Sequence, residues 1–265
     1  MCGRYTIIAS PEAIRALFGY EEQPNFPPRY NIAPTQPIVI VRLMDDKRHF
    51  ALVRWGLLPS WAKDPKNFSL LINARGETVS SKPAFRAAMK RRRCLIPADG
   101  FYEWKPAGAR KQPYFIRAKS GGSFAFAGLW ETWTGPNGEE VETAAIVTTS
   151  ANRTLSVIHD RMPVIVPPDA FDLWLDGVNV DPVTASALIA PAPENLLEVF
   201  PVSTDVNRIA NDNPKLVAPA SLSVGPEPAP ELVAKRGSAK RAPAKRAKKI
   251  AKKITKKTNG QGALF

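Results

Sequence analysis

Short runs of apolar residues, alternating with polar ones or continuous, predict that most of this chain folds as β-strands. The runs are rich in Val, Ile, Phe and Trp, which favour strands, and turn-forming Gly, Pro, Asn and Asp separate them. The predicted strands cover 37–44, 49–58, 94–104 (two strands around a turn), 113–118, 124–133, 141–150, 159–166 and 196–203.

Helical periodicity is limited to short segments that interrupt the strands. In the segment 11–20, Pro11 marks a helix start, Ile14 and Phe18 recur at helical spacing, and Gly19 marks the end. Strands and helices do not alternate regularly, so a parallel sheet is not expected. The pattern predicts an α+β fold with a curved, barrel-like, mostly antiparallel β core and peripheral helices. The other predicted helices cover 82–93, 152–158, 168–177 and 181–190.

Almost all of the net positive charge lies near the C-terminus. The chain carries a net charge of +13, and residues 234–257 contribute +12 through nine lysines and three arginines. A basic run of this composition does not bury enough apolar surface to fold alone. We therefore expect a folded domain over 2–222, a Pro-rich linker over 223–233 and a disordered Lys-rich tail over 234–265. The tail is interpreted as a nonspecific nucleic-acid-binding segment or, alternatively, as a solubilising one.

Composition argues against several classes of protein. No apolar run approaches the ~18 residues of a membrane-spanning helix, and no apolar leader precedes Cys2. Cys2 and Cys94 do not make a disulfide framework, and with His49 and His159 they lack the spacing of a zinc site. We expect a cytoplasmic, nucleoid-associated monomer that uses no metal or other cofactor and does not contact a membrane.

The chain begins MCGRYT, and Cys2 is the first candidate for chemistry. Removal of Met1, which a small second residue favours, would leave an α-amine and a thiol on one residue. This pair can close on an aldehyde to give a five-membered thiazolidine, and an α-amine pKa of roughly 7.7–8.0 keeps the nitrogen nucleophilic near neutral pH. A buried, inert thiol is the alternative interpretation. Acylation is disfavoured because neither a lipoprotein signal nor a glycine at position 2 is present.

Three further polar residues have suitable chemistry. Glu103 lies between two aromatic residues, where partial desolvation favours its protonated form and suits it to carry a proton. His159 precedes a predicted strand and has a side chain suited to general acid–base work. Asn73 would share one face with Arg75 and Glu77 if its segment were extended. Each also has an ordinary interpretation: Asn73 as a turn residue, Glu103 as a surface carboxylate and His159 as a structural histidine.

Eight motifs together resemble the SOS response-associated peptidase (SRAP) domain family. In chain order they are MCGRYT, YNIAPTQ, RWGLLPSWA, INARGETV, RRCLIPADGFYEW, FAGLWE, TTSAN and IHDRMPVIV, and the resemblance covers about residues 2–220. The resemblance implies an α+β domain with a barrel-like core that captures abasic sites in single-stranded DNA covalently through its N-terminal cysteine. It implies catalytic roles for Cys2, Asn73, Glu103 and His159. It places on the DNA-facing surface Arg4, Trp61, Arg75, Arg86, Trp104, Arg161 and Met162.

The predicted function is that of an abasic-site sensor, which forms a Cys2 thiazolidine crosslink and shields the lesion during replication or repair, with an AP lyase reaction beside it. Two other classes stay open. One is a cysteine peptidase or amidase that uses Cys2 as thiolate and His159 as base. The other is a nonenzymatic DNA-binding protein that acts through its tail.

The last five residues, QGALF, suggest a second partner. They resemble the short peptides that dock in the pocket of the bacterial sliding clamp, with Leu264 and Phe265 as apolar anchors and Gln261 at the rim. The predicted partners are therefore single-stranded DNA with abasic sites and the sliding clamp.

Overall fold

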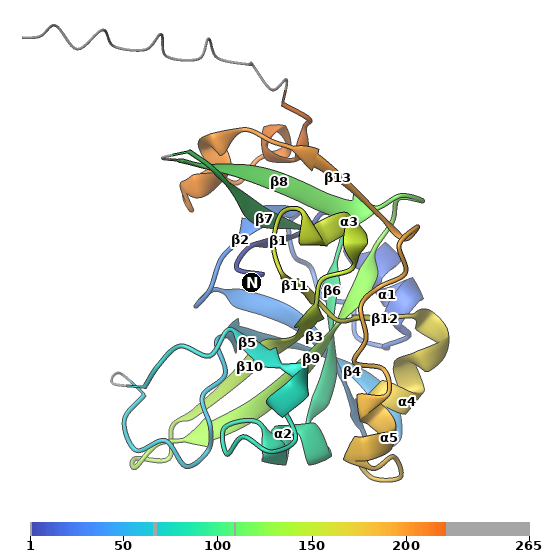
Figure 1. The fold of residues 1–265 in the computed structure, drawn as a ribbon. Helices are drawn as coiled ribbons and strands as arrows, with labels where there is room; N and C mark the ends of the chain where they lie inside the picture. Colours follow the sequence, from blue (N-terminus) through green and yellow to red (C-terminus); the bar gives the residue numbers. More distant parts are fainter. Residues whose placement is uncertain (1, 66–67, 109, 221–265) are drawn as a thin grey trace, which may run out of the picture. The chain divides into compact units, whose positions relative to one another are not determined.

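A closed ring of five hydrogen-bonded strands forms the centre of the computed structural model (Figure 1). Its members are β3 (Pro37–Met44), β4 (Lys47–Trp55), β6 (Arg93–Ala98), β9 (Phe124–Thr134) and β10 (Glu140–Ser150). The pairs β3–β4, β3–β6, β6–β9 and β9–β10 are antiparallel, and the parallel pair β10–β4 closes the ring. The predicted α+β fold with a barrel-like, mostly antiparallel core is confirmed.

Three short strands extend the barrel at its β9–β10 side. β5 (Asn73–Arg75) pairs in parallel with β10, and β11 (Arg161–Pro163) pairs with β10 in antiparallel fashion. β12 (Ile165–Val166) pairs with β9. These additions bring two predicted site segments, the one that contains Asn73 and the one that begins after His159, to the same barrel strand.

A second sheet has the strand order β13, β8, β7, β1, β2, and all of its pairs are antiparallel. In Figure 1, β8 and β13 lie at the top, and the barrel strands β3, β9 and β10 lie below them. The strands of this second sheet are β1 (Tyr5–Ile7), β2 (Arg29–Ile32), β7 (Gly100–Ala107), β8 (Arg110–Ala118) and β13 (Leu197–Pro201).

The helices are short and peripheral. In α1 (Pro11–Phe18), the Ser10 hydroxyl accepts a hydrogen bond from the amide of Ala13 at 3.2 Å, and Gly19 ends the helix in the left-handed conformation (φ 71°). The helix begins at Pro11 and ends before Gly19 as predicted, whereas the cap at Ser10 was not predicted. The others are α2 (Arg86–Arg91), α3 (Arg153–Ser156), α4 (Phe171–Leu175), α5 (Pro182–Ser186) and the 3₁₀ helices Gly76–Thr78, Pro168–Ala170, Thr204–Asn207 and Pro214–Val217.

Some predicted elements are longer than the observed ones. The helix predicted over 82–93 is α2, Arg86–Arg91, because Arg92 has an extended φ of −134° and the next residue begins β6. The strand predicted over 159–166 is two short strands, because β11 (Arg161–Pro163) pairs with β10 whereas β12 (Ile165–Val166) pairs with β9. Tertiary pairing thus overrides the local pattern at both positions.

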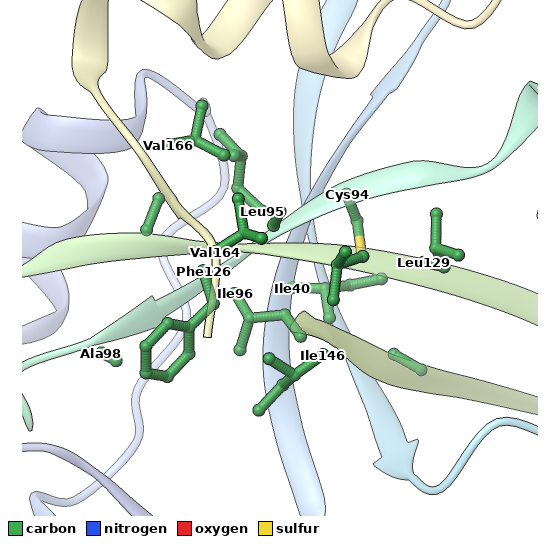
Figure 2. Packing of buried hydrophobic residues seen from close by; sticks show 14 of the residues in the cluster. Ile40, Cys94, Leu95, Ile96, Ala98, Phe126, Leu129, Ile146, Val164 and Val166 are labelled. Carbon is green, nitrogen blue, oxygen red and sulfur yellow. The ribbon is translucent and has the colours of Figure 1, made fainter. Parts of the chain in front are cut away.

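Apolar side chains of the barrel strands form the main core, part of which is drawn in Figure 2. Ile40, Leu95, Ile96 and Phe126 are all 0% exposed. Cys94 is also 0% exposed, and its partner across the strands is Gly128, where a Cβ atom would lie 2.8 Å from the Cys94 sulfur. Cys94 is therefore a packing residue of the core.

The structure describes residues 2–65, 68–108 and 110–220. The chain divides into a unit over Met1–Ser223 and a unit over Val224–Phe265. The predicted linker 223–233, the Lys-rich tail 234–265 and the clamp-like residues Gln261, Leu264 and Phe265 lie outside the described residues. Within the described ranges, no helix has the length and apolar character needed to cross a membrane.

Tyr5 gives a first testable prediction, on stability. Its ring packs edge-on against Trp55 and Phe126, with centroids 5.3 and 6.0 Å away, and no described residue hydrogen-bonds to its buried hydroxyl. A buried hydroxyl without a partner costs about 1–3 kcal/mol. Tyr5→Phe keeps the ring, so we expect it to raise the free energy of unfolding by about 1 kcal/mol in urea denaturation.

Tyr102→Phe is the matched control for this prediction. The Tyr102 hydroxyl donates to the carbonyl of Tyr30 at 2.8 Å, so its removal leaves a carbonyl with one partner fewer and should destabilise the fold. A destabilising effect of Tyr5→Phe as large as that of Tyr102→Phe would contradict the interpretation.

Candidate functional site

The pairing of β1 with β7 brings the N-terminal residues to Glu103. Tyr5 pairs with Phe101, and the amide of Tyr102 donates to the carbonyl of Arg4 at 3.0 Å. The strands are antiparallel, so the residues that precede Arg4 run towards the residues that follow Tyr102. The negative charge of Glu103 raises the pKa of the Cys2 thiol, as expected for two groups that this register brings together. Residues 101 positions apart in the sequence thus share one end of the second sheet.

Asn73 holds Cys2 from the barrel side. As the first residue of β5, Asn73 is fixed by the parallel pairing of β5 with β10, in which it lies opposite Ile146. Its Nδ2 donates to the carbonyl oxygen of Cys2 at 2.9 Å. Its Oδ1 is buried, and no hydrogen-bond donor among the described residues reaches it. Buried amide oxygens are normally hydrogen-bonded, so Oδ1 is an acceptor available to a ligand.

Cys2 is completely buried, at 0% exposed. Its sulfur lies 3.8 Å from the carbonyl oxygen of Arg4, to which the thiol donates. Burial raises the pKa of the Cys2 thiol far above its ordinary value, and the charge of Glu103 raises it further. The thiol is therefore protonated at neutral pH.

Glu103 and His159 line one cleft of about 740 Å³. Glu103 comes from β7 in the second sheet, whereas His159 comes from the turn before β11 on the barrel. The cleft therefore lies where the two sheets bring their residues together. Its other lining residues are mostly polar or charged, namely Arg4, Trp104, Arg110, Lys111, Thr204 and Asn207.

The two cleft residues have pKa values that suit proton transfer. Burial raises the pKa of Glu103 to about 7, so this carboxyl exchanges a proton near neutral pH. Partial burial is the main cause that lowers the pKa of His159, so its ring is neutral at pH 7. The amide of Arg161 donates to His159 Nδ1 at 3.0 Å. The Asp160 carboxylate lies 2.8 Å from the same Nδ1 and pairs with the ring when it is protonated.

The predicted DNA-facing arginines differ in how far their donors are occupied. Arg4 lines the cleft, but its guanidinium donates to Asn31 Oδ1 at 2.8 Å and to the carbonyl of Val206 at 2.7 Å. Arg4 therefore holds the segment after β13 against β2. Arg161 makes a two-pronged ion pair with Glu77 at 2.9 and 3.0 Å.

The other two predicted arginines are exposed. Arg75 is the last residue of β5, and Arg86 is the first residue of α2. Both side chains are reachable from solvent, and Arg75 lies two positions after Asn73.

The predicted stacking residues also differ. Trp61 is 57% exposed, and Trp104 is half-buried in the cleft wall, where its Nε1 donates to Asn207 Oδ1 at 2.8 Å. Met162 is 0% exposed, and its sulfur accepts a hydrogen bond from the amide of Asn152. The expectation that Met162 lies on the DNA-facing surface is therefore wrong, because its side chain packs into the main core.

Four cleft residues were not identified from the sequence: Arg110, Lys111, Thr204 and Asn207. Arg110 and Lys111 begin β8 and look like ordinary hairpin charges, and Thr204 and Asn207 bound a 3₁₀ helix after β13. For Arg110 and Lys111, the only signal in the sequence was a pair of cations close to the predicted strand that contains Glu103. The described residues contain no cluster of three or more His, Cys, Asp or Glu residues that could hold a metal ion.

The geometry defines an α+β β-barrel protein with a polar cleft that contains a glutamate and a histidine, and with an N-terminal cysteine whose carbonyl accepts a hydrogen bond from an asparagine. A family model described as SOS response associated peptidase (SRAP) matches residues 1–209. The chain belongs to this family, and the resemblance seen in its motifs is confirmed.

Curated relatives cover most of the chain. The abasic site processing protein YoqW of Bacillus subtilis (strain 168) is 40% identical over 221 residues, which are 82% of this chain and 99% of YoqW. The abasic site processing protein HMCES of Gallus gallus is 34% identical over 271 residues, covering 86% of this chain and 80% of that protein. A crystal structure of a protein from Bacteroides thetaiotaomicron matches with a TM-score of 0.76 at 26% identity, over 83% of this chain and all of that one.

Proposed function

We propose that this protein processes abasic sites in single-stranded DNA by capturing them covalently through Cys2, once Met1 has been removed. The observation that carries the proposal is that two candidate residues interact with Cys2. Asn73 donates a hydrogen bond to the Cys2 carbonyl, and the charge of Glu103 raises the pKa of the Cys2 thiol. Glu103 lines the same cleft as His159. The names of the curated relatives, which are abasic site processing proteins, support the same substrate.

The chemistry needs only the groups of Cys2 and the open aldehyde of the abasic sugar. The α-amine attacks the aldehyde carbon C1′, and the carbinolamine loses water to form an imine. The thiol sulfur then attacks the imine carbon, the thiol proton moves to nitrogen, and the thiazolidine ring closes. Ring closure removes the imine that would otherwise promote β-elimination and strand cleavage, so the captured DNA stays intact.

Each neighbouring residue has a role that follows from its geometry. Glu103, with a pKa of about 7, transfers protons between the amine and the departing hydroxyl. His159 catalyses opening of the sugar ring as a general acid and base. Asn73 fixes the Cys2 backbone through Nδ2, and its Oδ1 accepts a hydrogen bond from the hydroxyl that ring opening creates.

A cysteine peptidase or amidase is the main rival. That mechanism needs a Cys2 thiolate, which in reactive cysteines comes from a lowered pKa. In this protein burial and the charge of Glu103 both raise the pKa of the thiol. A protonated thiol is compatible with the proposed order, because the amine attacks first and the thiol delivers its own proton when the ring closes.

The direct test is to mix the full chain with a single-stranded oligonucleotide that carries one abasic site, without borohydride. We expect a protein–DNA band that survives denaturation. The same oligonucleotide with a tetrahydrofuran analogue at the lesion has no aldehyde and should give no band. A band of equal strength with both oligonucleotides, or with neither, would refute covalent capture through the aldehyde.

His159→Ala is expected to slow capture and reversal by a similar factor, about 10²-fold, because ring opening and closing use one proton path in both directions. The rates are measured by quenched gel assays of crosslink formation and of release into excess competitor. His49→Ala is the matched control, since His49 pairs with Glu22 at 2.7 Å and does not line the cleft. If His159→Ala reacts as fast as His49→Ala, then His159 has only a structural role.

The Lys-rich tail is proposed to raise the local concentration of the protein on DNA without entering the site. Deletion of residues 234–257 removes a charge of +12 and should flatten the salt dependence of DNA binding, measured by fluorescence anisotropy. The rate of crosslinking at saturating protein should stay within about twofold of the full chain. Loss of all DNA binding and capture on deletion would instead support the tail-driven, nonenzymatic alternative.

Further contacts are proposed with the two predicted partners. Arg75, Arg86 and Arg161 would contact phosphates, and Trp61 and Trp104 would stack beside the lesion. The C-terminal QGALF, which lies outside the described residues, stays a proposed docking peptide for the bacterial sliding clamp.

A further inference from the structure

The hairpin formed by β7 and β8 carries a pair of cations that the proposed chemistry does not use. Arg110 and Lys111 are the first two residues of β8, and they lie opposite Ala107 and Pro106 of β7. Both are exposed, and neither forms an ion pair with a residue that the structure describes. The sequence from 104 to 118 contains no Asp or Glu, so Glu103 is the only acidic residue in the two strands of the hairpin.

Both cations line the cleft that contains Glu103 and His159. The third cation in the cleft wall, Arg4, is already occupied by Asn31 and the carbonyl of Val206. Arg110 and Lys111 are therefore the positive charges at this cleft that are available to an anionic ligand. A polyanion that enters the cleft meets them next to the reactive residues.

The position of the hairpin relative to Cys2 indicates which side of a bound lesion its cations would face. On one side of Cys2, its carbonyl accepts a hydrogen bond from Asn73 of β5, and Arg75 lies two residues after Asn73 on that strand. On the other side of Cys2, the charge of Glu103 in β7 raises the pKa of the Cys2 thiol. Strand β7 then continues to the tip of the hairpin. Pro106, the partner of Lys111, is three residues beyond Glu103, or about 10 Å along the strand. This distance corresponds to about three stacked nucleotide steps.

We propose that Arg110 and Lys111 form a phosphate-binding site for the nucleotides on one side of the abasic site, and that Arg75 serves the other side. The ligand class is the sugar–phosphate backbone of single-stranded DNA. The arginine guanidinium can donate two parallel hydrogen bonds to a phosphate, and the lysine ammonium binds a phosphate as a compact positive charge. The assignment of the lesion to the cleft rests on the proposed function.

The test uses noncovalent binding, so that it does not depend on crosslinking. Two oligonucleotides carry the tetrahydrofuran analogue at one end, so that one has nucleotides only on its 5′ side and the other only on its 3′ side. The full-length double variant Arg110→Gln/Lys111→Gln is compared with the wild type by fluorescence anisotropy over a range of salt concentrations. Two lost phosphate contacts should reduce the salt slope by about 1.4.

We expect this loss for one of the two oligonucleotides and an unchanged slope for the other. The matched control is Arg117→Gln/Lys119→Gln, which removes the same two charges at the other end of β8, away from the cleft, and should leave both slopes unchanged. No loss, an equal loss on both sides, or an equal loss in the control would each overturn the proposal.

Crosslinking of an aldehyde-bearing oligonucleotide separates this inference from the proposed function. If wild-type protein forms no crosslink while the one-sided loss of binding is observed, the covalent mechanism fails and the phosphate site stands.

Discussion

Insertion of one alanine between Met1 and Cys2 is expected to abolish thiazolidine crosslinking. The inserted residue keeps the thiol in the chain but places the Cys2 nitrogen in a peptide bond, where it cannot attack an aldehyde. The expected loss is at least 10³-fold, since covalent capture depends on this nucleophile. The measurement is the yield of denaturation-resistant protein–DNA complex after mass spectrometry has verified the N-terminus.

Cys2→Ser is the informative companion to the insertion. Serine keeps a free α-amine after Met1 removal but closes the five-membered ring poorly, so the imine should persist, undergo β-elimination and raise strand cleavage. A peptidase that used the Cys2 thiol would respond differently, because it could tolerate a blocked amine. A normal crosslink yield from the alanine-insertion variant would refute the thiazolidine mechanism.

Glu103→Gln is expected to make the reaction slower and the fold more stable at high pH. Glutamine keeps the size and part of the hydrogen bonding of Glu103 but cannot carry a proton. General acid–base catalysis typically contributes about 10²–10⁴-fold, so we expect capture at saturating protein to slow by about 10²-fold. Binding to an oligonucleotide that contains the tetrahydrofuran analogue should be unchanged, which separates chemistry from affinity.

The effect on stability has the opposite sign and depends on pH. Burial raises the pKa of Glu103 from 4.5 to about 7, so the folded protein holds the proton more tightly than the unfolded chain does. The stabilisation is complete below pH 4.5 and is lost as the pH rises through 7, where a buried carboxylate must ionise. Relative to wild type, Glu103→Gln should gain up to about 3 kcal/mol between pH 4.5 and pH 8.

Urea denaturation at these two pH values checks the sign of this change. Glu77→Gln is the control, because the hydrogen bond from Arg161 is the main cause that lowers the pKa of that exposed carboxyl. Its substitution should not produce a gain in stability as the pH rises. If Glu103→Gln is equally stable relative to wild type at pH 4.5 and pH 8, then Glu103 does not have a raised pKa in the folded protein.

Local sequence patterns predicted elements whose cause is local. The strand predicted over 37–44 has the bounds of β3, because eight consecutive positions carry a clear apolar pattern. The two ends of α1 were predicted for the same reason, since Pro11 and Gly19 act on their immediate neighbours. The strands β1 and β5 were missed, because three residues are too few to show an alternation.

By itself, then, the sequence determined the α+β class, the chemical groups of the candidate site and, through its motifs, the family. Only the tertiary structure decided how these groups meet. Asn73 reaches Cys2 across 71 positions because β5 pairs with the barrel and β1 pairs with β7, and neither pairing leaves a local signal. The same long-range packing buried Met162 and brought Arg110 and Lys111 to the cleft, because burial and proximity depend on which strands become neighbours.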